Sequence, residues 1–206
     1  MIDREPFVYD RNGASAAEFA LVLPLLLLFL LGLIDTGRFM WEYNQAEKAT
    51  QMGVRYAVTT EMVPSGLEAY SFAVSDGVFA GEPVPTSSFQ EASCNTTSCS
   101  CTPGGGVCGA IGYDGIAFDA IVARMKAMYG PITDSNVVVE YRNIGLGYSG
   151  DPNGPDVAPL VTVRLIQGPN GFKFKPLSTM IFGVQVPMPD FRAALTLEDG
   201  TGTVAN

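Results

Sequence analysis

The chain has 206 residues, of which 47% are hydrophobic and only 16% charged, and its net charge is −9. Its twelve basic residues are scattered along the sequence, which argues against nucleic-acid binding. The absence of histidine removes the commonest general base and the commonest metal ligand. We find no catalytic constellation in the sequence, and therefore expect neither an enzyme nor a bound cofactor.

The N-terminal region predicts a membrane anchor. Residues 1–13 are short and polar, and their two arginines favour a cytoplasmic start. An uncharged apolar run then extends from Phe19 to Ile34, between Glu18 and Asp35. These roughly 16 residues cover ~24 Å of helix, slightly less than a ~30 Å hydrocarbon core, and their flanks extend the run. We expect a membrane-spanning helix over residues 14–40, because membrane helices tolerate a proline such as Pro24.

The same helix is predicted to continue past the membrane to about Thr60, with Pro64 marking its end. Small and aromatic residues recur there at helical spacing, on one narrow face. They are Tyr43, Ala46, Ala49 or Thr50, Gly53, and Tyr56 or Ala57. A face of small side chains permits close approach to a sheet or to another helix.

Glu18 stands directly before the apolar run, where a lone carboxylate is costly unless it is paired. If a peptidase cut between Gly13 and Ala14, Glu18 would become the fifth residue of the mature chain. The new terminal ammonium, its own or that of a neighbouring subunit, would then neutralise the carboxylate and fix the register of packed helices. The alternative is an interfacial glutamate that reaches toward the lipid headgroups. We favour processing and assembly.

The sequence from Gly13 to Phe19, GASAAEF, continues as LVLPLLLLFLLGLIDTGRFMWEYNQAEKATQMGVRYA. This stretch resembles the TadE-like family of the tight-adherence (Flp) pilus system, most densely over Arg11 to Ala57. Two C-terminal motifs resemble the same family less specifically, Phe172-x-Phe174-x-Pro176-Leu177 and the run from Phe191 to Thr196.

The resemblance implies a type IV prepilin-like pseudopilin or minor pilin with a structural role. Residues 1–13 would be a leader that prepilin peptidase removes at Gly13–Ala14, and Glu18 and Phe19 would serve assembly. The implied partners are other pilins, the inner-membrane assembly platform and membrane lipid. The protein would lie in the inner membrane with its N-terminus cytoplasmic and residues 41–206 exported, at the base of a pilus or within it.

All four cysteines lie in a Gly-, Ser- and Thr-rich segment, residues 81–112, that reads as a loop. They are Cys94, Cys99, Cys101 and Cys108. A zinc site with four thiolates is an alternative, but the spacing lacks the paired CxxC units of common zinc sites. An even number of cysteines on the export side favours two disulfides, with three connectivities open.

The remaining elements complete an α+β prediction. Ser65 and Glu68 form a capping-box pattern before a short helix over residues 67–75, and Asp114 caps a second helix that Gly130-Pro131 ends. Strands are expected at 136–142, 160–166, 172–175 and 191–198. We therefore predict a long N-terminal helix, half transmembrane and half soluble, packed on a small antiparallel sheet.

Two motifs between the strands predicted at 136–142 and 160–166 resemble binding sites, but we interpret both as parts of a loop. Gly145, Gly147 and Gly150 spell a dinucleotide-binding fingerprint, but turn residues rather than a helix follow them. Asp151, Asn153 and Asp156 offer oxygen atoms for Ca²⁺, although their spacing does not match an EF-hand loop. A plain hairpin connection is favoured for both.

The alternative to a pilus component is an unprocessed single-pass membrane protein with an exported domain that binds a ligand or partner. A membrane-anchored enzyme is a third, weaker reading. The N-terminal sequence of the native protein discriminates between the first two.

Overall fold

The structure is a computed structural model that describes residues 13–103, 106–167, 172–179, 183–198 and 200. The proposed leader, apart from Gly13, therefore lies outside the described residues. The chain divides into two compact units. The anchor unit comprises the chain up to Trp41 together with Phe174–Val186, and the sheet unit comprises Glu42–Lys173 and the chain from Pro187 onward.

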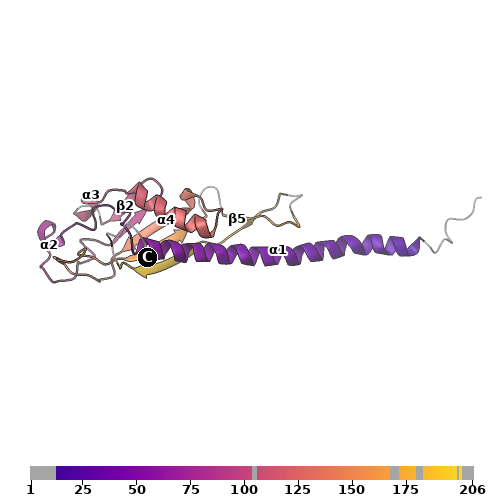
Figure 1. Cartoon of the computed structure of the whole chain (residues 1–206), viewed down its shortest axis with the longest axis horizontal. Coiled ribbons are helices and arrows are strands. Elements are labelled where there is room, and N and C mark those ends of the chain that lie inside the picture. Colours follow the sequence, from indigo (N-terminus) through magenta and orange to yellow (C-terminus); the bar gives the residue numbers. More distant parts are fainter. Residues whose placement is uncertain (1–12, 104–105, 168–171, 180–182, 199, 201–206) are drawn as a thin grey trace, which may run out of the picture. The chain divides into compact units, whose positions relative to one another are not determined.

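One long helix and an antiparallel sheet dominate the structure, which confirms the α+β prediction (Figure 1). The helices are α1 (Ala14–Ala57), α2 (Phe72–Ser75), α3 (Val107–Ala110) and α4 (Gly115–Met128). A 3₁₀ turn covers Asp134–Asn136. The strands are β1 (Glu91–Cys94), β2 (Cys99–Thr102), β3 (Val137–Arg142), β4 (Leu160–Leu165), β5 (Lys173–Phe174), β6 (Val186–Pro187) and β7 (Phe191–Thr196).

The main sheet has five strands in the order β2-β1-β3-β4-β7, and every neighbouring pair is antiparallel. In the centre, Val139 of β3 lies opposite Val163 of β4. Strand β4 buries Val161, Val163 and Leu165, and Thr162 between them is buried as well. A separate two-stranded sheet pairs β5 with β6.

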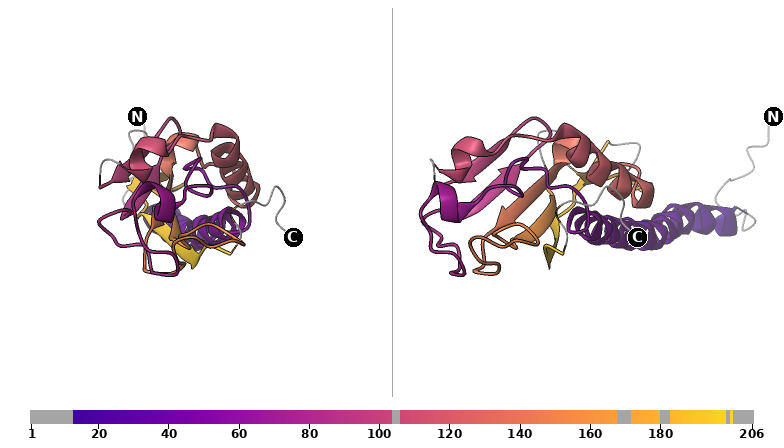
Figure 2. Two further views of the ribbon diagram at one scale, coloured as in Figure 1. Left: turned by 90° about the vertical axis from the view of Figure 1, so that its left-hand side faces the viewer. Right: turned by 60° about the vertical axis from the view of Figure 1, so that its left-hand side comes forward.

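Helix α4 forms where its sequence predicts. The Asp114 carboxylate accepts hydrogen bonds from the backbone N–H groups of Ile116 and Ala117, at 2.8 and 3.0 Å. This is the arrangement by which an N-cap residue satisfies the first free donors of a helix. The helix lies beside the sheet (Figure 2) and buries one apolar face, formed by Phe118, Ile121, Val122 and Met125.

The C-terminal part of α1 uses small residues to reach the core of the sheet unit. Ala46, Ala49 and Ala57 are fully buried. At Gly53 the approach is so close that an added Cβ would lie 2.8 Å from Met125 Cγ and 3.3 Å from Val163. The predicted small-residue face therefore meets both α4 and strand β4.

Two local predictions were wrong. The segment after Ser65 is turn rather than helix, because Gly66 has φ +91° and the carbonyl of Ser65 accepts a hydrogen bond from Gly112 N–H. The only helix that forms there is the four-residue α2, which begins at Phe72. The segment 81–112 is not all loop, since it contains β1, β2 and α3.

Candidate assembly and membrane-anchoring segment

The predicted processing site lies at the start of α1. Helix α1 begins at Ala14, and the carbonyl of Gly13 accepts the first hydrogen bond of the helix from Ala17 N–H, at 3.1 Å. Glu18 and Phe19 follow on the first turns, and both side chains are exposed. The carboxylate of Glu18 thus belongs to the exposed surface at the N-terminal end of the apolar run.

The apolar run forms helix throughout, and Pro24 lies inside that helix. Its mean hydropathy reaches 2.6 over an 18-residue window, and none of that window is buried by the rest of the protein. Large apolar side chains are exposed on all sides of it, including Leu21, Leu25 and Phe29. By length and composition this helix can cross a membrane, and leaving such a surface in water would be costly. The surface requires a nonaqueous neighbour, either lipid or protein.

A cluster of contacts marks the end of the apolar run. Asp35 is buried, and its two carboxylate oxygens accept hydrogen bonds from the backbone N–H groups of Leu177 and Ser178, at 2.6 and 2.8 Å. The Arg38 guanidinium lies 3.6 Å from the same carboxylate. Asp35 thereby satisfies two backbone donors that belong to a segment far along the chain.

Arg38 and Phe39 extend this cluster on the same face of α1, three and four residues after Asp35. The Arg38 guanidinium lies over the Phe174 ring, 5.4 Å from its centroid, and donates to the carbonyl of Lys175 at 3.5 Å. Phe39 meets Phe174 edge to face, with the ring centroids 5.4 Å apart. Phe174 itself is almost fully buried.

Sequence reasoning did not find this cluster. From the sequence, Asp35 was recognised only as the charged residue that follows the apolar run. Residues 35, 38 and 39 share a helical face, which is a usable signal for a contact. Their partners, however, lie in the Pro-rich bend after Phe174, and nothing in the spacing links the two segments.

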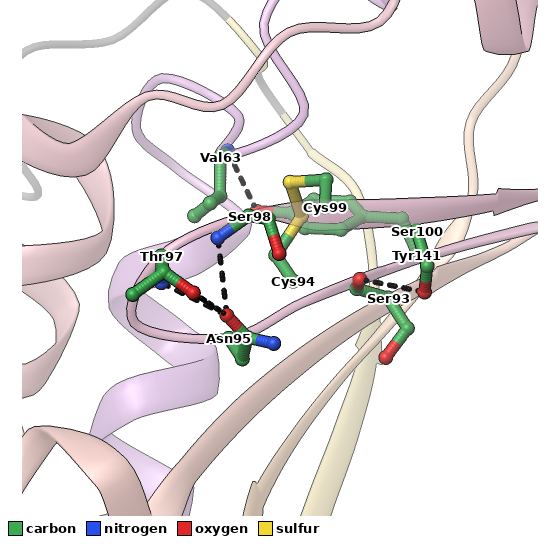
Figure 3. The surroundings of a disulfide bond; sticks show 9 residues. All are labelled: Val63, Ser93, Cys94, Asn95, Thr97, Ser98, Cys99, Ser100 and Tyr141. Atoms are coloured by element: carbon green, nitrogen blue, oxygen red, sulfur yellow. Dashed lines mark hydrogen bonds between the residues drawn. A yellow bond between two sulfur atoms is a disulfide. The ribbon is translucent and has the colours of Figure 1, made fainter.

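The four cysteines form two disulfides, Cys94–Cys99 and Cys101–Cys108. The first joins the paired ends of β1 and β2, where the Asn95 side chain also accepts hydrogen bonds from Thr97 and Ser98 (Figure 3). The second links β2 to α3. This answers the question of connectivity, and the sulfur atoms are not arranged as four free thiolates.

Next to the first disulfide, Tyr141 of β3 is fully buried and its hydroxyl accepts a hydrogen bond from Val63 N–H, at 3.2 Å (Figure 3). Burial raises the pKa of Tyr141, so that the phenol stays neutral. Tyr141 thus provides a buried hydrogen-bond acceptor for the backbone of the segment that follows α1.

The carboxylates of two of the three weak calcium candidates, Asp151 and Asp156, accept hydrogen bonds from backbone N–H groups. The buried Asp156 carboxylate accepts from Phe72 N–H at 2.8 Å and from Asp151 N–H at 3.2 Å. Asp151 in turn accepts from Asn153 N–H. Among the described residues there is no group of three or more His, Cys, Asp or Glu side chains placed to hold a metal ion.

The glycine motif lies in the connection between β3 and β4. Gly147 has φ +87°, and an added Cβ would lie 2.7 Å from the carbonyl oxygen of Asp156. The three glycines therefore permit tight turns and close backbone contact in this connection. No helix follows them before β4, so the nucleotide-binding arrangement of strand, glycine turn and helix is absent from this described segment.

The N-terminal segment of the chain matches a known protein family. The family described as TadE-like protein matches residues 13–55, which include the apolar run and most of α1. No curated protein and no solved structure gives a significant match to the chain. The resemblance seen in the sequence is thus confirmed for this N-terminal segment, and the family is one of structural pilus components rather than enzymes.

Proposed function

We propose that this chain, whose residues 13–55 are TadE-like, is a minor pilin or pseudopilin of a Tad-type pilus. In this proposal prepilin peptidase cuts between Gly13 and Ala14. The apolar part of α1 then anchors the protein in the inner membrane and later packs against the helices of neighbouring pilins. Residues 41–206 are the exported domain.

The observation that carries the proposal is the uncovered apolar run directly behind an exposed glutamate. A helix with no buried residues over its most apolar window needs lipid before assembly and protein after it. Glu18 gives that helix one charged group at its entry, where a terminal ammonium of the same chain or of a neighbour can pair with it. The two disulfides agree with an oxidising, exported location for the sheet unit.

The proposal is tested by replacing Glu18 with glutamine in the native host. The substitution keeps the size of the side chain and removes its charge. Loss of one member of a buried ion pair typically costs ~3–5 kcal/mol, so co-purification with partner pilins should fall by roughly a hundredfold or more. Membrane insertion and the unfolding midpoint of the sheet unit should stay unchanged.

Glu61→Gln is the matched control, because Glu61 is also exposed but lies in the sheet unit. It should assemble as the unchanged protein does. If Glu18→Gln protein assembled normally in cells that make pili, the carboxylate would be merely interfacial and the assembly role would be wrong.

The alternative function, an unprocessed single-pass protein with a binding domain, shares the anchor and differs at the N-terminus. It predicts that residues 1–13 remain on the mature protein.

A further inference from the structure

The hairpin that contains β5 and β6 contacts α1 at a defined position along the helix, next to Asp35. We refer to residues 174–186 as the 174–186 hairpin; its described arms are 174–179 and 183–186. The two hydrogen bonds from the N–H groups of Leu177 and Ser178 to Asp35 hold the first arm against α1 one residue after the apolar run ends. The Thr179 hydroxyl donates to the carbonyl of Val184 at 3.4 Å and so connects the two arms.

The two arms of the hairpin carry exposed apolar side chains. Leu177 is 42% exposed and Val184 is 50% exposed, and Val186 is exposed to a similar degree. On α1, Met40 and Trp41 are exposed just beyond the cluster. Tryptophan is enriched where a membrane meets water, because its ring is apolar and its N–H is polar.

The polar atoms at the cluster are paired, as a site beside lipid requires. In a medium with little water, an unsatisfied backbone N–H costs several kcal/mol. Asp35 removes that cost for the N–H groups of Leu177 and Ser178, and those groups together with Arg38 compensate its own charge. The hairpin can therefore approach the headgroup region without exposing these donors.

We propose that the 174–186 hairpin is a second membrane contact, which Asp35 holds at the level where α1 leaves the bilayer and which places Leu177 and Val184 in the lipid interface. This rests on the anchoring part of the proposed function. The occupant we commit to is lipid, because the exposed apolar side chains continue the apolar surface of α1 past its last uncharged turn. Covering by a second copy of the chain is the competing outcome.

Fluorescence quenching in vesicles tests this with the full-length chain. Since all four native cysteines are in disulfides, a cysteine introduced at one position can be labelled selectively without reductant. An environment-sensitive dye is placed at Val184, at Leu30 in the apolar run, or at Val74. Val74 is the matched control, since it is also an exposed valine but lies on α2 of the sheet unit. The vesicles are phosphatidylcholine with nitroxide lipids labelled near the headgroup or deep in the chains.

We expect shallow nitroxides to cause a loss of fluorescence at Val184, deep nitroxides to cause one at Leu30, and neither to affect Val74. The additional substitution Asp35→Asn should reduce the quenching of the Val184 probe and leave the quenching of the Leu30 probe unchanged. The new amide nitrogen would face one of the two backbone N–H donors and could not accept its hydrogen bond. Reduced quenching at Val184 that follows Asp35→Asn supports the role of the carboxylate.

The proposal is overturned if the Leu30 probe is quenched and the Val184 probe behaves like that at Val74; the membrane anchor would then stand alone. If Val184 is shielded only when the protein-to-lipid ratio is raised, a second copy covers the hairpin and lipid is the wrong occupant. If the Leu30 probe is not quenched either, the anchoring part of the proposed function fails first.

Discussion

At Gly53, helix α1 packs so closely in the sheet unit that there is no room for a side chain. Its missing side chain lets α1 approach Met125 of α4 and Val163 of β4. In a helix, glycine is ordinarily less favourable than alanine by roughly 0.5–1 kcal/mol. Its presence here therefore reflects a packing requirement that outweighs helix propensity.

Replacing Gly53 by alanine should lower the free energy of unfolding of the sheet unit by about 1–3 kcal/mol, because the added Cβ overlaps Met125 and crowds Val163. Denaturant unfolding of the detergent-solubilised chain measures the change. Gly37→Ala is the control, since Gly37 lies in the same helix with no atom within 4 Å of an added Cβ. That variant should show no loss. Equal unfolding midpoints for Gly53→Ala and the unchanged protein would show that the Met125 side chain moves aside without a loss of stability.

At the scale of elements, prediction succeeded where the information was local. Asp114 caps α4 because its carboxylate reaches donors two and three residues ahead, and sequence spacing alone reveals this. The strands β3 and β4 were visible as runs of β-branched residues. Both features depend on neighbours in the chain, so tertiary contacts had little to change.

Prediction failed where distant segments decide the backbone. Ser65 and Glu68 have the spacing of a capping box, but the Ser65 carbonyl is bonded to Gly112 and Gly66 takes a left-handed conformation. The cysteine-rich segment looked like loop because four-residue strands give little periodicity. Asp35 was visible as the end of the apolar run, but its partners lie more than 140 residues away.

The β1–β2 hairpin is so short that we expect its disulfide to contribute much of its stability. Cys94 and Cys99 are five residues apart and pair across the two strands. Closing a loop of this length removes unfolded-state entropy worth about 2 kcal/mol. Replacing both cysteines by serine should therefore lower the free energy of unfolding by at least this amount, since Cys94 is also buried.

Denaturant unfolding with and without reductant checks this prediction. Reductant should lower the midpoint of the unchanged protein further than that of the double variant, which retains only Cys101–Cys108. If the double variant unfolded at the same denaturant concentration as the unchanged protein, the sheet would hold the hairpin without its disulfide.

At the scale of the whole molecule, the anchor unit and the sheet unit differ in where their apolar side chains lie, exposed in the first and buried in the second. The anchor unit exposes an apolar helix with one glutamate at its entry. The sheet unit has an apolar core, a capped helix and two disulfides. The TadE-like segment, residues 13–55, includes all of the apolar run and continues into the part of α1 that belongs to the sheet unit. An exposed apolar helix joined to a disulfide-bonded α+β domain agrees with the proposed role as a pilus component.

The proposal that prepilin peptidase processes this chain is tested by the N-terminus of the native protein. Protein isolated from its host, with the prepilin peptidase present, is subjected to N-terminal sequencing and intact-mass measurement. We predict a mature chain that begins Ala-Ser-Ala-Ala-Glu, with Glu18 as its fifth residue. A mature protein that retains Met1 and the rest of residues 1–13 would contradict it.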